Sequence, residues 1–257
     1  MCGRYASTRK VEELLEELPV DEVAPALRER PLTPDYNVAP TTQVPAVVQR
    51  PARDEGGPGA KQLRTLRWGL VPSWAKDPGI GSRMINARAE TVAEKPAFRA
   101  AFARRRCLLP ADGYYEWYET ESLTAKGKPR KQPFFISPAD GGLLVMAGLF
   151  EMWPDPQKAD DDPDRWLWTT TVITTTATDD VGRIHDRMPM MLEPGSYEAW
   201  LDPGQDDRDT LLGLLRPAAP GSLRAWPVSP AVGNVRNNSA ELLEPLPAEE
   251  TLLGDDA

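Results

Sequence analysis

Runs rich in β-branched and aromatic residues recur along most of this chain, and few helical stretches separate them. The runs lie at residues 43–49, 62–68, 106–110, 114–119, 133–137, 143–152, 166–176 and 223–228. The first two flank a Pro- and Gly-rich stretch at 51–60, which predicts a hairpin with a long loop. No helix follows each strand and no internal repeat is present, so a doubly wound parallel sheet is disfavoured. The pattern predicts an α+β fold: a single domain with a mostly antiparallel, barrel-like β-sheet core and peripheral helices.

Two segments have the character of helices. Apolar residues recur at helical spacing near the N-terminus, at Val11, Leu14, Leu15 and Leu18. This spacing predicts a helix from about residue 8 to residue 18, with Ser7 or Thr8 as its N-cap. A second helix is expected at 88–103, interrupted at Pro96.

A chain of 257 residues with 40% hydrophobic content is long enough for one large domain. We assign residues 1–238 to that domain and residues 239–257 to an acidic C-terminal tail that frays. The longest apolar run, residues 143–150, is too short to cross a membrane. We therefore expect a monomer that does not associate with membranes.

The two cysteines, Cys2 and Cys107, provide neither a disulfide framework nor a CxxC pair for zinc. Free thiols fit a reducing intracellular compartment, and the first residues are too polar and too few for a secretory leader. We expect a cytoplasmic protein, associated with the nucleoid if it is bacterial, that needs no metal and no cofactor. Cys107 lies in a β-like run and is expected to be a buried structural thiol.

Cys2 becomes the N-terminal residue if Met1 is removed, and its free α-amine and thiol then sit on one carbon. An α-amine with a pKa of about 7.7–8.0 is partly unprotonated at neutral pH, and a thiol with a pKa near about 8.5 supplies some thiolate. The amine can form an imine with an aldehyde, and the sulfur can then close a five-membered thiazolidine. The same residue could instead be a small apolar side chain buried under the first helix.

Basic residues gather in one segment although the whole chain has a net charge of −9. Between residues 81 and 107, seven Lys or Arg residues against two Glu residues give a local charge of +5. The acidic residues are concentrated in segments that resemble loops or tail. A basic groove that binds nucleic acid is one interpretation of this distribution, and a solvated helix face is the other.

Six short strings mix polar and aromatic residues in ways that core packing does not require. They are Met1-Cys-Gly-Arg-Tyr, Tyr36-Asn-Val-Ala-Pro, Trp68-Gly-Leu-Val-Pro-Ser-Trp, Ile85-Asn-Ala-Arg-Ala-Glu, Asp112-Gly-Tyr-Tyr-Glu-Trp and Ile184-His-Asp-Arg-Met-Pro. In this order, across roughly residues 1–235, the chain resembles the SRAP (SOS response-associated peptidase) family.

The resemblance implies a DNA-damage-response enzyme that crosslinks itself to abasic sites in single-stranded DNA through the processed Cys2. An abasic deoxyribose opens to an aldehyde, which is the electrophile that the amine and thiol of Cys2 would capture. The partner is then single-stranded DNA that contains abasic sites, the activity is of lyase type, and no cofactor is needed. Met1 would be removed either by autoproteolysis or by an aminopeptidase.

The resemblance implies catalytic roles for Cys2, Glu116, His185 and Asn86. Glu116 lies in an apolar run, where desolvation would raise its pKa and suit it to proton transfer, although an alternating strand could also turn it to solvent. His185 is the one histidine of the chain, and a lone histidine can also be structural. Asn86 has a neutral amide that could hold the amine or the sugar hydroxyls, or it could be a turn residue.

The resemblance implies DNA contacts by Asn37, Arg88, Arg187, Arg4 and Thr174. Trp68 and Trp74, which flank a Gly-Leu-Val-Pro turn, are further candidates for DNA binding. Guanidinium groups suit phosphate, and an exposed tryptophan beside an abasic gap could stack on the neighbouring base. Asn37 could equally be a turn residue, and core packing explains most tryptophans.

Two other functions stay open. An N-terminal-nucleophile hydrolase would use the thiol of Cys2 to attack an amide while the α-amine acts as base, and it would turn over through an acyl-enzyme. A noncovalent single-strand binder would depend on the arginines and tryptophans and would tolerate Cys2→Ala.

Overall fold

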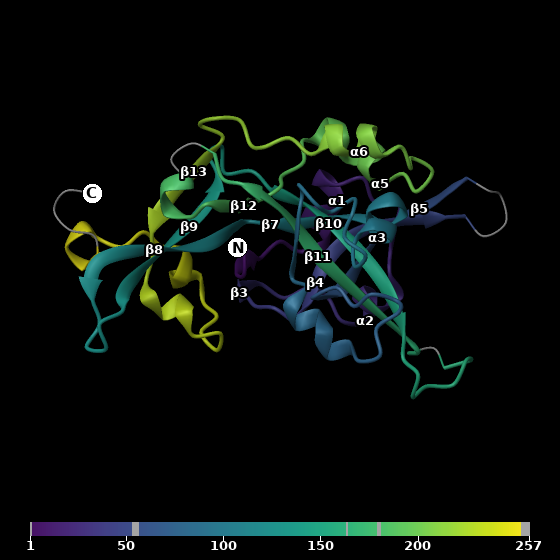
Figure 1. Cartoon of the computed structure of the whole chain (residues 1–257), viewed down its shortest axis with the longest axis horizontal. Coiled ribbons are helices and arrows are strands. Elements are labelled where there is room, and N and C mark those ends of the chain that lie inside the picture. The colour runs from purple at the N-terminus through teal and green to yellow at the C-terminus, as the bar shows by residue number, and fades with distance from the viewer. Residues whose placement is uncertain (1, 53–56, 163, 179–180, 253–257) are drawn as a thin grey trace.

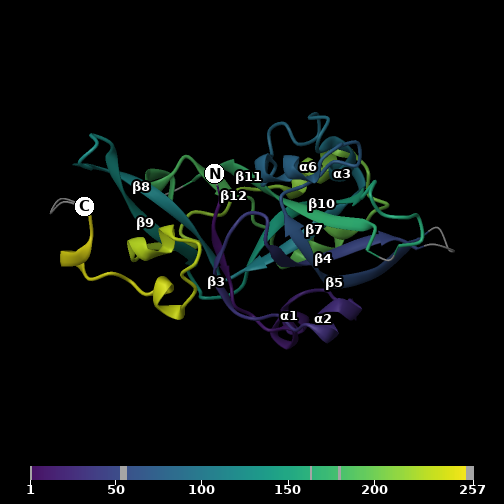
Figure 2. The ribbon, with the colours of Figure 1, turned by 90° about the horizontal axis from the view of Figure 1, so that it is seen from below.

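The computed structural model of the protein describes residues 2–52, 57–162, 164–178 and 181–252. A helix-flanked barrel and a second sheet, which carries the C-terminal residues, meet near the beginning of the chain (Figure 1). The view from below shows the same arrangement, with the first strand between the two parts (Figure 2).

In the described chain, five strands pair in a closed ring. They are β4 (Gln43–Pro51), β5 (Pro58–Trp68), β7 (Arg106–Ala111), β10 (Leu144–Pro154) and β11 (Trp166–Thr176). Antiparallel pairs follow the order β11-β10-β7-β4-β5, and a parallel contact of β11 with β5 closes the ring. Short strands extend the sheet: β2 (Glu22–Val23), β6 (Asn86–Arg88) and β12 (Arg187–Pro189). The predicted α+β fold with a mostly antiparallel, barrel-like sheet is confirmed.

The second sheet is antiparallel throughout, in the order β13-β9-β8-β1-β3. Its strands are β1 (Tyr5–Ser7), β3 (Asp35–Val38), β8 (Gly113–Leu123), β9 (Pro129–Pro138) and β13 (Leu223–Pro227). Strand β8 follows β7 of the barrel after a single residue, Asp112, so the chain passes directly from one sheet to the other. All eight predicted strand runs lie in strands of the structure.

Short helices cover the outside of the barrel, with α1 and α2 on one side and α3 and α6 on the other (Figure 2). The α-helices are α1 (Val11–Glu17), α2 (Pro25–Glu29), α3 (Arg99–Arg104), α4 (Val181–Ile184), α5 (Tyr197–Leu201) and α6 (Arg208–Leu214). The 3-10 helices are η1 (Pro78–Arg83), η2 (Pro194–Ser196), η3 (Pro230–Gly233), η4 (Ala240–Leu243) and η5 (Ala248–Glu250).

The alternation of side chains along the barrel strands gives the barrel two apolar layers, one inside it and one between it and the helices. On β4, Val44, Ala46 and Val48 point into the barrel, whereas Val47 points outward to the helices. The interior is tightly packed, because a Cβ atom on Gly148 would lie 2.8 Å from the sulfur of Cys107. Cys107 is fully buried there, as expected from the sequence.

Two helix predictions need correction. The predicted helix at 88–103 is wrong for its first part: Arg88 ends strand β6, and the backbone N–H of Ala89 donates to Thr174 O of β11 at 2.9 Å. Residues 89–98 then form turns and a bend, and only Arg99–Arg104, beyond Pro96, is helical. The first helix begins later than predicted, with Lys10 as its N-cap, because the N–H of Thr8 donates to Asp112 instead.

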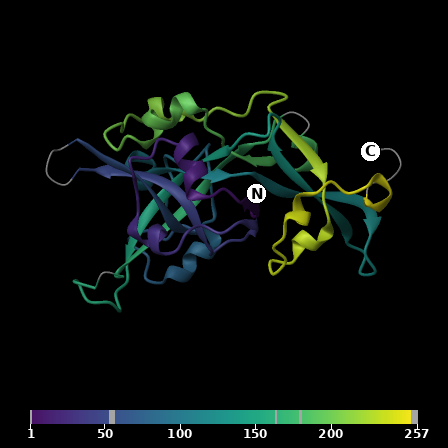
Figure 3. The same cartoon turned by 180° about the vertical axis from the view of Figure 1, so that it is seen from behind.

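The described C-terminal residues, up to position 252, pack on the second sheet (Figure 3). The sequence had predicted a frayed tail instead. Leu242 is buried against Tyr115, Phe135 and Val228. The indole N–H of Trp226 donates to Leu243 O at 2.8 Å. The described part of this acidic stretch is thus a component of the fold.

Candidate active site

Cys2 is fully buried at the junction of the barrel and the second sheet, in one cluster with Tyr5, Trp68 and Tyr114. The side-chain amide of Asn86 donates to Cys2 O at 2.8 Å. Burial raises the pKa of the Cys2 thiol far above its ordinary value, and the negative charge of Glu116 raises it further. In the chain that still carries Met1, the thiol is therefore neutral.

Strand pairing brings Glu116 to Cys2. Tyr5 of β1 pairs with Tyr114 of β8, and the N–H of Tyr115 donates to Arg4 O at 2.9 Å. In this antiparallel register, the chain running back from Tyr5 to Cys2 passes beside the residues that follow Tyr114 on β8. Cys2 and Glu116 therefore lie close together, as the effect of the carboxylate on the thiol also indicates.

Glu116 is only 3% exposed, so its side chain does not face solvent. Burial raises the pKa of its carboxyl to about 7. The protonated and ionised forms of Glu116 are then both populated at neutral pH, which suits a group that must take up and release a proton.

His185 follows α4 and directs one ring nitrogen towards Glu116, with Nε2 4.0 Å from the carboxylate Oε2. The backbone N–H of Arg187 donates to the other nitrogen, Nδ1, at 2.9 Å, so the neutral ring carries its proton on Nε2. Asp186 Oδ1 lies 3.0 Å from the same Nδ1. Burial lowers the pKa of His185, and the charge of Asp186 opposes that shift.

Asn86 is held by β6, which pairs with β11 in parallel, and it is not a turn residue. Its Oδ1 is buried and has no hydrogen-bond partner among the described residues. The same is true of the Tyr114 hydroxyl. Sequence reasoning missed Tyr114, although its position two residues before Glu116 on a strand places both on one face.

Arg187 is engaged within the protein. Its guanidinium donates to both carboxylate oxygens of Glu90, at 2.7 and 3.1 Å, and to Thr174 O at 2.7 Å and Oγ1 at 3.2 Å. Thr174 is buried, and a contact with DNA stays a prediction for it. Glu90 is the last residue of the Ile85-Asn-Ala-Arg-Ala-Glu string, and no signal in the sequence indicated that it pairs with Arg187.

Asn37 is only 3% exposed and is engaged within the protein, so a contact with DNA stays a prediction. Its amide donates to the backbone oxygens of Val232, Asn234 and Asn237, at 3.3, 3.1 and 2.8 Å. Arg4 Nη1 donates to Asn37 Oδ1 at 2.7 Å. Asn37 therefore links β3 to the end of η3 and to the residues that follow it.

The two tryptophans beside the Gly-Leu-Val-Pro turn have opposite environments. Trp68 has no exposed surface, packs against Tyr5 with ring centroids 5.1 Å apart, and donates its indole N–H to Ile85 O at 2.9 Å. Trp68 is therefore not presented to a base in this structure. Trp74 is 59% exposed and Arg88 is exposed, so both are available to a ligand.

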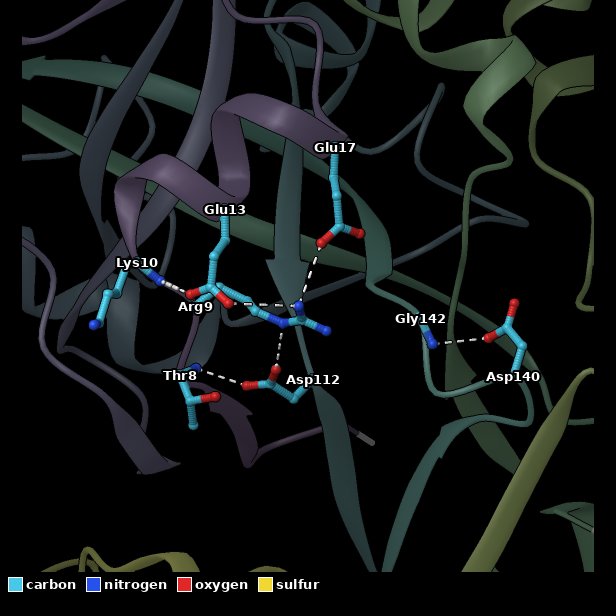
Figure 4. A network of polar contacts seen from close by, with 8 residues as sticks. All are labelled: Thr8, Arg9, Lys10, Glu13, Glu17, Asp112, Asp140 and Gly142. Atoms are coloured by element: carbon cyan, nitrogen blue, oxygen red, sulfur yellow. Dashed lines mark hydrogen bonds and ion pairs between the residues drawn. The ribbon is translucent and has the colours of Figure 1, made fainter.

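A polar network fixes the start of β8, which carries Tyr114 and Glu116 (Figure 4). Asp112 accepts from the backbone N–H of Thr8 at 2.6 Å and from Arg9 Nε at 3.2 Å. Arg9 also lies 3.4 Å from a carboxylate oxygen of Glu17 on α1. The network joins α1 and β1 to the corner between the two sheets.

Among the described residues, no group of His, Cys, Asp and Glu side chains is arranged to hold a metal ion. No helix in the described chain is long and apolar enough to span a membrane.

Comparison with known proteins identifies relatives across the chain. A family model described as SOS response associated peptidase (SRAP) matches residues 1–235. The abasic site processing protein YoqW of Bacillus subtilis is 38% identical over 244 residues, covering 95% of this chain and 99% of that protein. YedK of Escherichia coli, with the same description, is 33% identical over 251 residues, covering 96% and 100%. HMCES of Gallus gallus, also an abasic site processing protein, is 33% identical over 244 residues, covering 86% and 68%.

A solved structure supports the fold. A crystal structure of a protein from Bacteroides thetaiotaomicron superposes with a TM-score of 0.74 at 22% sequence identity, covering 95% of this chain and all of that chain.

Proposed function

The chain belongs to the SRAP family. We propose that it processes abasic sites in DNA by capturing them covalently on Cys2. The mature protein would lack Met1, so that Cys2 carries a free α-amine beside its thiol. The substrate would be the open-chain aldehyde of an abasic site in single-stranded DNA. The relatives described as abasic site processing proteins support the choice of substrate.

The proposal rests chiefly on the group beside Cys2. Glu116 is buried and has a pKa of about 7, and its charge acts on the Cys2 thiol. A nucleophile next to a buried proton carrier is the arrangement that general acid–base chemistry requires. Asn86 holds the Cys2 carbonyl at 2.8 Å and fixes the backbone of the nucleophile.

The reaction would proceed in two covalent steps. The α-amine of Cys2 adds to the aldehyde carbon, and the carbinolamine loses one water to give an imine. The sulfur then adds to the imine carbon, a carbon–sulfur bond forms, and the thiol proton passes to the nitrogen. The product is a thiazolidine, and the net change is the loss of one water. Glu116 would carry protons in the dehydration and in ring closure.

His185 would supply a second proton carrier. Its Nε2 carries the proton of the neutral ring and lies 4.0 Å from Glu116. We assign it proton transfer to the sugar ring oxygen during ring opening, or the accompanying β-elimination, which is the lyase-type part of the activity. Removal of Met1 by the protein itself or by an aminopeptidase would precede both reactions.

DNA would be held by exposed groups around the junction. Arg88 and Trp74 are free to contact phosphate and base, respectively. Arg4 is half-buried, and Arg187 would have to exchange its contact with Glu90 for a phosphate. We further propose that the protein acts as a monomer in the cytoplasm.

The test is a comparison of adducts on denaturing gels. Wild-type protein lacking Met1 should form an SDS- and heat-stable adduct with a single-stranded oligonucleotide that contains an abasic site. A tetrahydrofuran analogue, which cannot open to an aldehyde, should give none. Cys2→Ala should abolish the stable adduct, whereas Cys107→Ala, which changes the other buried thiol, should retain it if the variant folds. A stable adduct with Cys2→Ala would contradict the proposal.

A further inference from the structure

Tyr114 shares one face of β8 with Glu116, because side chains two residues apart on a strand point the same way. Tyr115, between them, points to the opposite face, where its hydroxyl donates to Tyr36 O at 2.7 Å. Tyr114 has no exposed surface and packs in the cluster that contains Cys2. Its phenol therefore faces the same interior as the proposed nucleophile.

The hydrogen-bonding capacity of this buried phenol is unused. No described residue donates to the Tyr114 hydroxyl or accepts from it. Buried hydroxyl groups nearly always have a partner, so an unpaired one needs an explanation. Asn86 Oδ1, on the residue whose Nδ2 binds the Cys2 carbonyl, is a second buried atom without a partner among the described residues. Asn86 Oδ1 requires a hydrogen-bond donor, and the Tyr114 hydroxyl requires an acceptor.

A processed Cys2 would supply both. Its α-ammonium would be a donor for Asn86 Oδ1, and its ionised sulfur would be an acceptor for the Tyr114 hydroxyl. Burial, and then the charges of Cys2 and Glu116, raise the pKa of Tyr114 well above its ordinary value. The phenol thus keeps its proton and acts as a hydrogen-bond donor.

Building on the proposed function, we propose that Tyr114 is a positioning residue that donates a hydrogen bond to the thiolate sulfur of Cys2 and favours the ring-closing step. In that step the sulfur bonds to the imine carbon, and the proton released by the thiol reaches the imine nitrogen through Glu116. Tyr114 keeps its own proton throughout. Imine formation uses the amine and the aldehyde alone, so it does not depend on Tyr114.

Other titratable groups face the same interior and set the background for any pH dependence. They are Tyr5 from β1, Glu116 from β8, Cys107 from β7 and His185 from the turn after α4. The effect of Tyr114 on the pH profile must therefore be measured by comparing variants that all retain these groups.

Tyr114→Phe, in protein lacking Met1, removes the hydroxyl and keeps the ring. Borohydride trapping measures the imine, and the SDS- and heat-stable adduct measures the closed thiazolidine. We expect imine trapping to equal that of the wild type and ring closure to slow by about tenfold or more, the typical effect of losing a hydrogen bond to a charged group. The pH profile of ring closure should move to higher pH. Tyr115→Phe, which removes a phenol hydroxyl from the other face of the strand, is the matched control and should leave ring closure unchanged.

A second measurement needs no DNA. Alkylation of Cys2 by iodoacetamide, followed on the N-terminal peptide by mass spectrometry, gives the apparent pKa of the thiol in each variant. Tyr114→Phe should raise that pKa. An unchanged pKa, or a loss of imine trapping equal to the loss of ring closure, would overturn the inference. If the wild type forms no adduct, the proposed function fails, and the alkylation result alone decides the role of Tyr114.

Discussion

Glu116 is a buried carboxyl whose ionisation is predicted to destabilise the fold. Its folded pKa of about 7 lies above the usual value of 4.5, so between these pH values the folded chain retains a proton that the unfolded chain has released. Its contribution to stability is complete below the unfolded pKa and is lost as the pH rises through the folded pKa. The shift corresponds to roughly 3 kcal/mol.

Glu116→Gln stays neutral at every pH and should remove this effect. In urea denaturation of the full chain, the variant should be more stable than the wild type at about pH 8, and the difference should disappear towards about pH 5. Equal unfolding midpoints at both pH values would show that the carboxyl is not strained by burial.

Asn37 is predicted to act on stability. Asn37→Ala removes the side-chain donor of Asn237 O and a second donor from Val232 O and Asn234 O, and it should lower the free energy of unfolding by about 2 kcal/mol or more. Asn234→Ala, at an exposed position of the same segment, is the control. Urea denaturation measures the loss. Unchanged stability with weakened DNA binding would support Asn37 as a DNA contact.

The sequence indicated which residues form the candidate site better than it indicated which of them are buried. Cys2, Asn86, Glu116 and His185 were chosen from the sequence, and the structure gathers them around one junction. The burial of Trp68 was not predictable, because a strand end and a turn can present a tryptophan to either side.

At the scale of elements, the C-terminal turns are predicted to contribute to stability. Leu242 of η4 is 3% exposed against the second sheet, so Leu242→Ala should cost about 2–5 kcal/mol of unfolding free energy. Leu15→Ala, at a 42% exposed position of α1, should cost much less. Thermal unfolding of both variants measures the contrast. Equal small losses would mean that the C-terminal segment is a dispensable tail.

Long strands were predictable from the sequence, and short ones were not. The apolar runs that became β10 and β11 each carry enough residues for a pattern. Strands β1 and β6 have three residues each, and they exist because neighbouring strands supply hydrogen-bond partners. The same partnership placed Arg88, the first residue of the predicted second helix, in the sheet.

The sequence predicted a barrel-like sheet, but it did not identify the pair of strands that closes the barrel. Closure depends on a parallel contact between Thr169 and Arg67 and between Thr170 and Trp68, about a hundred positions apart in the chain. Sequence periodicity reports which residues face inward, but it does not report which distant edges meet.

For the whole molecule, a net charge of −9 predicts weak noncovalent binding to DNA. If Arg4, Arg88 and Arg187 supply the phosphate contacts, the slope of log affinity against log salt on single strands should be about −2, at ~0.7 per contact. Fluorescence anisotropy with an oligonucleotide lacking abasic sites measures this slope. A much steeper slope would require a larger basic surface than these arginines form.

The most direct test of the central claim is intact-mass spectrometry of the purified protein, before and after incubation with a single-stranded oligonucleotide that carries one abasic site. We expect a chain without Met1 that gains the mass of the oligonucleotide less one water. A chain that has lost Met1 and gains no mass would contradict capture of the aldehyde by Cys2. An adduct that retains Met1 would contradict the requirement for a free α-amine.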